Sequence, residues 1–597
     1  MVLGSHLLGD ASLRSTLARH WPNAPLVLEP VEWQDLTDHF PGRTERRWRT
    51  PAALLHARYQ VLPFRGRAEL LAQLRDWSRE PDFGARLVHG AGGQGKTRLA
   101  LELAGLLAAD GWAVLWLRAG AAVRDLEVLR RAAVPTLIVV DYAEMRAAQI
   151  TGLLDAVNRR EPGPAVKLLL LARTVGDWWH GLSLGSRVAE YLLDDAAAIE
   201  LPSLETDFGS SRAEEYLQAV HGFAAGLAEV DGWEHHDWPE AVNRLVAAQR
   251  LRGHPAARPD GTVLALHMAA LADLLDTAEQ IAAGSESEEQ ASGADELEDR
   301  LLAHEERYWR ALADSRGLRS FLSERRLMDA LAAAFLFGAE DGVEADAILR
   351  HVPGLMDLSR DRRSAVRSWI SAVAPSARSR PWDSLQPDRL AERFVGRRLE
   401  YNHTIPDAVV PAASPAQLAQ LLSVYSRVAT HRVFEGALYR HLVALCVRHA
   451  VALGPVAVEV ATQTEAPGPL LEALHRITDA PGIPLAELER LVERLPKQSE
   501  RLASWAARVT ELIVNEHRAL ARADPPDCRA SPTTSTTSAS DSPGRARAWA
   551  PWRSRWMPSA SGAASPRRTP ALTGPNSPPL SATWASSSPH RAVPGKP

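Results

Sequence analysis

A glycine-rich stretch between residues 90 and 97 has the residue types that hold phosphate groups. Its spacing is G-x-x-x-x-G-K-[ST]. Glycines let main-chain N–H groups close on phosphate oxygens, the lysine brings a positive charge to the terminal phosphates, and the threonine hydroxyl can ligate Mg²⁺. A glycine-rich turn without function is the alternative. We expect ATP or ADP, with Mg²⁺, to bind at Gly90, Ala91, Gly92, Gly93, Gln94, Gly95, Lys96, Thr97 and Arg98.

Two acidic residues follow an apolar run, Thr136–Val140, that stops abruptly at a carboxylate. Asp141 would then lie at the carboxyl edge of a buried strand, where it can hold Mg²⁺ opposite Thr97. Glu144 lies three residues further on and can orient or deprotonate an attacking water. Each has a plainer alternative, because Asp141 can cap a helix and first-turn acids such as Glu144 are common on electrostatic grounds.

An arginine, Arg173, ends the apolar run Val166–Ala172. At this edge of a sheet its guanidinium could reach the terminal phosphate and report whether that phosphate is present. An ordinary surface arginine is the alternative. Lys96, Glu144 and Arg173 are therefore the candidate catalytic residues, and Thr97 and Asp141 the candidate metal ligands.

Alternating elements must position these side chains. We expect strands at 85–89, 112–117, 136–141, 166–172 and 197–200, and helices starting at 68, 96, 125 and 142. Strands that alternate with helices predict an α/β fold whose parallel sheet is covered by helices on both faces. Trp178 and Trp179 should pack in its core.

The composition excludes several classes of protein. The chain has 597 residues and a net charge of −5, so nothing global favours nucleic acid or an anionic membrane as a partner. Cys446 and Cys528 are too few for a disulfide framework, and no apolar run reaches the roughly 20 residues of a membrane span. We expect a cytoplasmic protein. His235 and His236 lack partners at metal-ligand spacing and should be surface or capping residues.

The remainder divides by composition. Residues 1–60 contain several prolines and have no role that the sequence indicates. We expect the phosphate-binding domain at 61–205 and a helical lid domain at 206–300, with a polar loop at 284–293. Residues 301–410 and 411–523 continue with helical periodicity, clearest in 308–321, 327–337, 416–429 and 433–452. Residues 524–597 are rich in Ser, Pro, Thr and Arg and should be disordered.

The order of these motifs resembles the STAND NTPases, bacterial P-loop ATPases related to AAA and NB-ARC proteins. The resemblance covers roughly residues 60–400. It rests on an entry motif with Phe64, Gly66, Arg67 and Glu69, which is one residue short of the usual spacing, on the phosphate-binding loop, on 141–144, on Arg173, on 201–204 and on 385–392. It implies a helical lid followed by a winged-helix-like module at 301–410, and a helical connector at 411–523.

The resemblance also implies a function. Related proteins are nucleotide-controlled switches that oligomerise, signal or defend against phage, and hydrolyse ATP slowly. Met145 stands where the family often has a second acid, so a scaffold that binds nucleotide without hydrolysing it is one alternative. An ATPase-linked transcription regulator is another, but it needs a DNA-binding helix pair that neither terminus shows. We expect a nucleotide-dependent homo-oligomer and no membrane or nucleic acid partner.

The tail prompts a separate hypothesis. The codons for Thr533–Ser540, read in a shifted frame, can give a string similar to the start of a tetratricopeptide repeat of the kinesin-light-chain type. A frameshift would then have truncated a repeat domain that binds a protein partner. Resequencing the gene tests this idea, because stop codons scattered through the alternative frame would exclude it.

Overall fold

A computed structural model gives the structure of this chain over residues 48–201, 212–248, 261–284, 297–376, 380–434, 436–481, 483–496 and 499–523. The chain divides into two compact units, 1–528 and 529–597, and only the first contains described residues. Several predictions made above lie outside them. These are the role of most of the N-terminal segment, residues 202–204 of the 201–204 motif, the polar loop at 285–293, and the disorder and frameshift of the tail.

The predicted parallel sheet is confirmed, with strand order β2-β3-β4-β1-β5 and every neighbouring pair parallel. Its strands are β1 (Phe83–His89), β2 (Ala113–Trp116), β3 (Thr136–Asp141), β4 (Val166–Ala172) and β5 (Ala197–Glu200). Every residue of β4 is buried, as its continuous apolar run predicts for a strand between two others. β1, β3 and β4 are central, so their carboxyl ends bring the phosphate loop, Asp141 and Arg173 to one edge.

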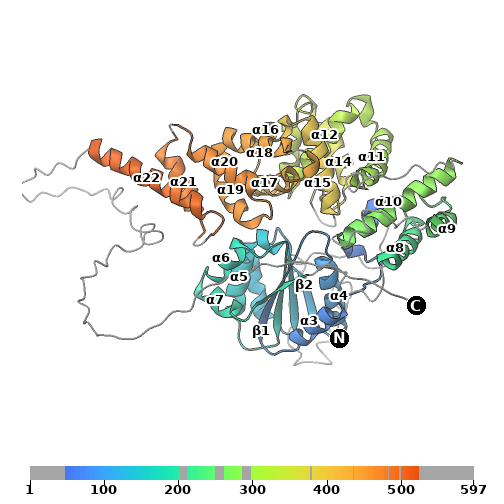
Figure 1. Ribbon diagram of the computed structural model, residues 1–597, viewed down its shortest axis with the longest axis horizontal. Helices are drawn as coiled ribbons and strands as arrows, with labels where there is room; N and C mark the ends of the chain where they lie inside the picture. Colours follow the sequence, from blue (N-terminus) through green and yellow to red (C-terminus); the bar gives the residue numbers. More distant parts are fainter. Residues whose placement is uncertain are drawn as a thin grey trace, which may run out of the picture. The chain divides into compact units, whose positions relative to one another are not determined.

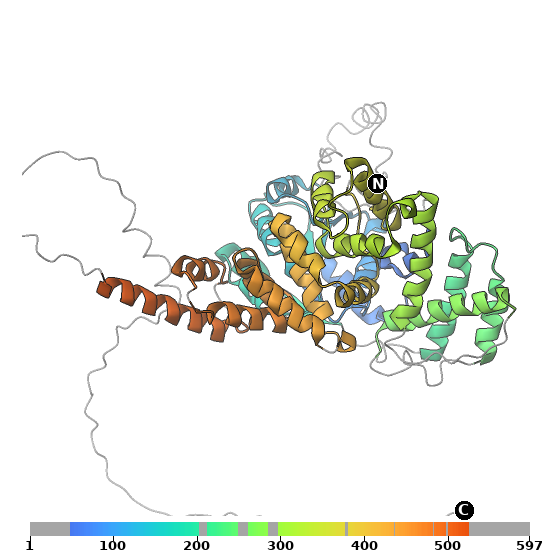
Figure 2. The same ribbon diagram turned by 90° about the horizontal axis from the view of Figure 1, so that it is seen from above.

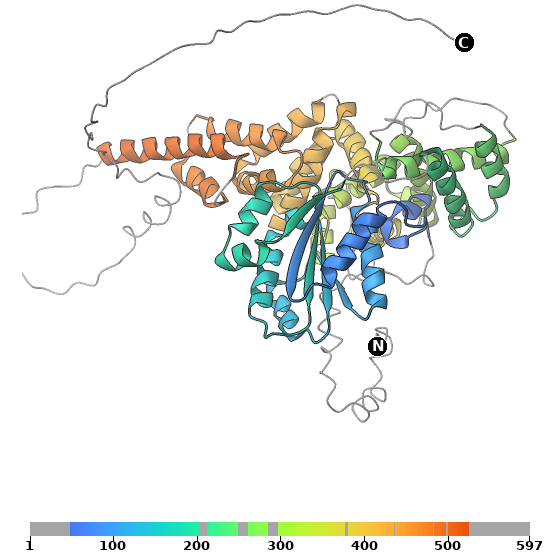
Figure 3. The same cartoon turned by 60° about the horizontal axis from the view of Figure 1, so that its bottom comes forward.

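Helices cover both faces of the sheet, as expected (Figure 3). One face packs against α3 (Ala68–Ser78) and α4 (Lys96–Ala109). The other packs against η4 (Val123–Arg131), α5 (Ala147–Asn158), α6 (Asp177–Ser183) and α7 (Arg187–Leu193). Trp178 and Trp179 are buried in this second layer, in agreement with the prediction.

Two local predictions need correction in this domain. The helix expected from residue 125 is the 3₁₀ helix η4, which ends at Arg131, before Pro135. The helix expected from residue 142 begins later, because Tyr142 adopts a left-handed conformation (φ 53°) that an α-helix cannot contain. A 3₁₀ turn, η5 (Ala143–Met145), fills the interval before α5.

The rest of the described chain is helical (Figure 1). These helices share one continuous apolar core. Trp48, Ala52 and Leu54, near η2 (Pro51–Leu55), belong to this core and not to that of the sheet. The α-helices are α8 (Arg212–Leu227), α9 (Trp238–Ala248), α10 (Val263–Ala282), α11 (Leu297–Ser315), α12 (Glu324–Phe337), α13 (Gly342–His351), α14 (Arg360–Val373), α15 (Asp388–Tyr401), α16 (Thr404–Val409), α17 (Pro415–Ala429), α18 (Ala437–Arg448), α19 (Ala450–Gln463), α20 (Gly468–Thr478), α21 (Leu485–Glu493) and α22 (Ala503–Ala523). The short 3₁₀ helices are η3 (Ala57–Tyr59), η9 (Leu318–Ser320), η10 (Val410–Ala412) and η11 (Arg432–Phe434).

The helical part also differs from the prediction in two details. The single helix expected at 433–452 is divided into η11, α18 and α19, with the break at His449. The described residues between 297 and 412 contain helices and no β-strand, so a β-wing is not found among them. α22, red-orange in Figure 2, is one uninterrupted helix at the end of the described residues. No helix among the described residues is both long and apolar enough to cross a bilayer.

The sheet core generates a stability prediction at Leu170, which is fully buried in β4 between Leu87 and Val140. Leu170→Ala should destabilise the domain by about 2–5 kcal/mol, because it removes buried methyl groups and leaves a cavity. Tyr191→Ala on α7, where the side chain is 77% exposed, serves as the control. Urea unfolding should show a lower midpoint for Leu170→Ala alone, and equal midpoints would contradict this packing.

Candidate nucleotide site

The phosphate-binding loop joins β1 to α4 and has the backbone geometry that its glycines allow. Gly90, Gly93 and Gly95 all have positive φ angles, of 153°, 81° and 91°. At Gly93 an added Cβ would lie 2.8 Å from Cβ of Leu264, at the start of α10, so a side chain is excluded there. The main-chain oxygen of Gly93 also accepts a hydrogen bond from the Leu264 N–H (3.2 Å). The helical part therefore lies directly against the loop.

Lys96 folds back over this loop. Its ammonium donates hydrogen bonds to the main-chain oxygens of Gly90 (2.5 Å) and Ala91 (3.0 Å). Burial lowers the pKa of Lys96 below its usual value, and the carboxylate of Asp141 opposes that shift. These weak neutral acceptors can be exchanged for phosphate oxygens, to which a charged donor bonds more strongly.

Thr97 and Asp141 are brought together, as the metal prediction requires. The Thr97 hydroxyl donates to Oδ2 of Asp141 at 3.0 Å, and Oδ1 of Asp141 accepts the Tyr142 N–H at 3.0 Å. Burial raises the pKa of Asp141, and the Thr97 hydrogen bond opposes the rise. Hydroxyl and carboxylate oxygens are the donors that Mg²⁺ prefers, so the pair fits this ion. When bound, Mg²⁺ neutralises charge on the phosphates.

Glu144 lies at the same edge but turns inward. Its side chain is 4% exposed, and Oε1 accepts the main-chain N–H of Arg173 at 3.3 Å. Oε2 is buried with no hydrogen-bond partner among the described residues. Burial raises the pKa of Glu144. A carboxylate with a raised pKa is suited to accept a proton, and its unpaired oxygen leaves that capacity unused.

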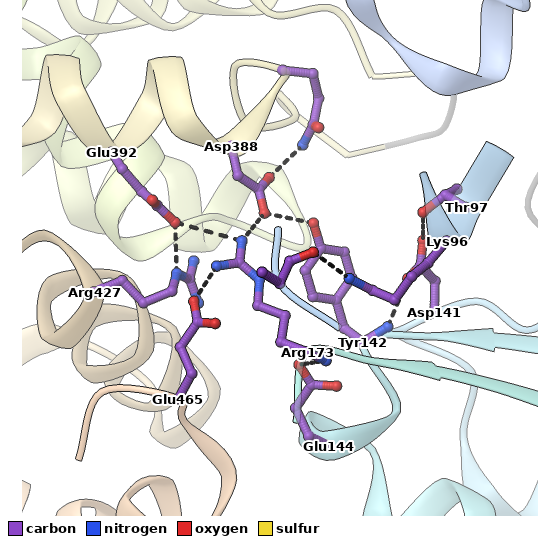
Figure 4. A network of polar contacts seen from close by, with 12 residues as sticks. Lys96, Thr97, Asp141, Tyr142, Glu144, Arg173, Asp388, Glu392, Arg427 and Glu465 are labelled. Atoms are coloured by element: carbon purple, nitrogen blue, oxygen red, sulfur yellow. Dashed lines mark hydrogen bonds and ion pairs between the residues drawn. The ribbon is translucent and has the colours of Figure 1, made fainter. Parts of the chain in front are cut away.

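Arg173 is not an ordinary surface arginine, because its side chain is 12% exposed and contacts three acids (Figure 4). Its guanidinium pairs with Asp388 (2.8 Å), Glu392 (3.6 Å) and Glu465 (2.5 Å), which we term the carboxylate cluster. Burial alone would lower the pKa of Arg173, but the carboxylate cluster raises it above its usual range. The cluster belongs to α15 and to the segment after α19, so helical modules hold the arginine.

A cavity of about 830 Å³ unites these groups, lined by the phosphate-binding loop, Asp141, Glu144, Arg173 and residues of the helical part. Arg67 and Arg98 also line it. Arg67 donates to the main-chain oxygen of Gln94 (3.1 Å). Arg98 bonds Glu102 (2.5 Å) and lies over the ring of Phe64, so its guanidinium is committed to protein groups.

No local sequence pattern predicts the carboxylate cluster as a unit. Asp388 and Glu392 are one helical turn apart in the 385–392 stretch, which is a weak signal for a shared face. Glu465 is 292 residues from its partner and has no local signal. His235 and His236 take no part in the site: the ring of His236 stacks on Trp233, and no cluster of metal-ligating side chains occurs in the described ranges.

Comparisons with known proteins agree with the site geometry. Residues 60–182 match the family model described as Novel STAND NTPase 5. We found no match among curated proteins. Among solved structures, the Aeropyrum pernix ORC2 protein with ADPNP and ADP is 14% identical (TM-score 0.26; 58% of this chain and 98% of that chain covered).

Two further solved structures are similar at the same level. The A. pernix ORC1 protein in complex with DNA is 17% identical, with a TM-score of 0.27 and coverage of 60% and 98% of the two chains. Drosophila ORC bound to DNA and Cdc6 is 13% identical, with a TM-score of 0.24 and coverage of 87% and 95%. Such TM-scores carry no argument about function. The family match and the phosphate-binding loop at the edge of a parallel sheet do: the chain carries a nucleotide-binding P-loop NTPase domain of the STAND type.

Proposed function

We propose that this protein is an ATP-binding molecular switch in which the terminal phosphate of the nucleotide controls how the helical modules pack. The observation that carries the proposal is the pairing of Arg173 with Asp388, Glu392 and Glu465. Arg173 directly follows the carboxyl end of β4, and it also lines the cavity that contains the phosphate-binding loop. A triphosphate and the carboxylate cluster would therefore compete for one guanidinium.

The energy that such a switch needs sets a scale for this competition. Inverting a 1:99 equilibrium to 99:1 takes about 5.5 kcal/mol of differential binding. One hydrogen bond to a charged group is worth about 1.5–3 kcal/mol, so exchange of several Arg173 contacts, together with lid contacts such as Leu264 to Gly93, is of the right order.

The resemblance to STAND NTPases extends the proposal to what the switch controls. The open state would form a nucleotide-dependent homo-oligomer, and signalling or defence against phage would follow. Mg²⁺ held by Thr97 and Asp141 would accompany the nucleotide, and ATP hydrolysis with Glu144 as the base would be slow and return the closed state.

The first test concerns binding. Lys96→Ala should abolish ATP binding and leave the fold intact, because it removes the only ammonium that contacts the phosphate-binding loop in the described part of the chain. Arg79→Ala is the control, because Arg79 directly follows α3 and its side chain is 60% exposed. Calorimetric titration with ATP and circular dichroism measure the two properties. Undiminished affinity would refute the site.

The second test concerns the γ-phosphate. Arg173→Gln should leave ADP affinity near that of the wild type and weaken binding of a non-hydrolysable ATP analogue by roughly ten- to a hundredfold, as expected for loss of a charge-assisted contact. Size-exclusion chromatography should then give one elution volume with both nucleotides. Arg187→Gln on α7, an exposed arginine, is the matched control. An unchanged affinity ratio would contradict the switch.

A second candidate function, a scaffold that binds nucleotide without turnover, is favoured by two observations. Met145 occupies the position of a second acid, and it packs toward the helical part, where the Ser423 hydroxyl lies 3.7 Å from its sulfur. Glu144 is also partly engaged by the Arg173 N–H.

Phosphate release separates the two functions. Glu144→Gln should abolish hydrolysis in a switch with Glu144 as its base, and Glu190→Gln on α7, where the residue is exposed, should not. Because the pKa of Glu144 is raised, its basic form is present only above that higher pKa, so the rate should fall as pH falls through it. Equal rates in wild type and Glu144→Gln would leave only the scaffold.

A further inference from the structure

The turn after β4 is attached to the helical part at a second point, four residues beyond Arg173. Asp177 is the first residue of α6, and it is buried although it makes no contact with the phosphate-binding loop. Its Oδ2 accepts hydrogen bonds from the Ser499 hydroxyl and from the Arg501 N–H (3.1 Å). Its Oδ1 accepts the Glu500 N–H at 3.2 Å. One carboxylate thus holds three donors directly before α22.

The same segment before α22 also determines where Glu465 lies. The Arg501 guanidinium donates to the main-chain oxygen of Thr464 at 2.6 Å, one residue before Glu465. It also lies beside Gly176, where an added Cβ would be 3.4 Å from Nη2. Glu465 in turn pairs with Arg173 at 2.5 Å. These contacts close a ring from Arg173 through 464–465 and Arg501 to Asp177, and back along the chain.

The turn that completes this ring is itself held in shape. The Trp178 indole N–H donates to the main-chain oxygen of Thr174 at 2.9 Å, and the ring of Trp178 is buried. The turn between Arg173 and Asp177 is therefore short and held by a hydrogen bond of its own. Since Thr464 and Glu465 are adjacent, loss of the Arg501 contact loosens the acid that pairs with Arg173.

We propose that Asp177 is a positioning residue that couples α22 to the nucleotide site: its hydrogen bonds at 499–501 keep Glu465 on Arg173 and so favour the diphosphate. This rests on the proposed function. Release of the segment before α22, by whatever acts on the chain beyond residue 523, would free Arg173 for a third phosphate. Coupling of this kind is reciprocal, so a triphosphate that draws Arg173 away should loosen α22.

Asp177→Asn tests the coupling. An asparagine of the same size turns one acceptor oxygen into an N–H donor that faces other donors, so at least one of the three contacts at 499–501 should break and the segment should loosen. The expected result is a shift of the affinity ratio of ATP analogue to ADP toward the triphosphate by about tenfold, within the usual range for coupled sites. Hydrogen exchange in 499–523 should also become faster. A merely structural aspartate would weaken both nucleotides alike.

The control is Asp479→Asn, which removes an exposed acid that pairs with Arg508 of α22 and should leave the ratio unchanged. In the Arg173→Gln background, Asp177→Asn should have no effect on the ratio, because the coupling acts through Arg173. If Asp177→Asn fails to fold, Arg501→Gln removes the Thr464 contact and should give the same shift. A normal ratio in a folded variant would overturn this inference, while the effect of Arg173→Gln alone decides the proposed function.

Discussion

A buried guanidinium that needs acidic partners is the constraint on which the rest of the site depends. Arg173 is largely withdrawn from water, and removing a charge from water costs several kcal/mol unless opposite charges are close. Asp388 supplies one of them, and Arg173 and Arg427 hold the pKa of that half-buried carboxyl below its usual range, against the effect of burial. Neither side can leave without exposing the other to the same cost. The ion pairs of Arg173 therefore connect the sheet to the helical modules. Another anion can take the place of these carboxylates, and a nucleotide phosphate is such an anion.

The phosphate-binding loop has a complementary property. Lys96 already has acceptors, the oxygens of Gly90 and Ala91, so its ammonium is kept near the place where phosphates would lie without being left unpaired. Its pairing with neutral carbonyls is weaker than a pairing with charged oxygens, and the difference favours an incoming phosphate. Lys96 and Arg173 thus resemble each other in one respect. Each is paired with protein groups that a phosphate could replace. They differ in where that partner comes from, because the loop satisfies Lys96 locally, whereas Arg173 depends on residues more than 200 positions away.

That difference also explains what could be predicted from the sequence. The strands that end at Asp141 and at Ala172 were correct to the residue, because buried apolar runs with abrupt polar ends depend only on local sequence. The pairing of Thr97 with Asp141 followed from parallel strands sharing one edge. The partners of Arg173 did not follow, since they depend on how helices pack and no periodicity encodes that. The left-handed conformation of Tyr142 was likewise missed, because a tyrosine gives no sign of a positive φ.

Tyr142 shows why this unexpected conformation matters. Its main-chain N–H donates to Asp141, beside Thr97, and its hydroxyl donates to Asp388 at 2.6 Å, beside Arg173. A non-glycine residue at φ 53° is strained and persists only where its surroundings fix it. Here the two hydrogen bonds fix it from both ends. If Asp388 moves away with its helix, Tyr142 loses one of the contacts that hold its backbone, and the N–H that orients Asp141 is released with it. Asp141, the proposed metal ligand, and Arg173, the proposed phosphate sensor, are thus connected through Tyr142 and Asp388.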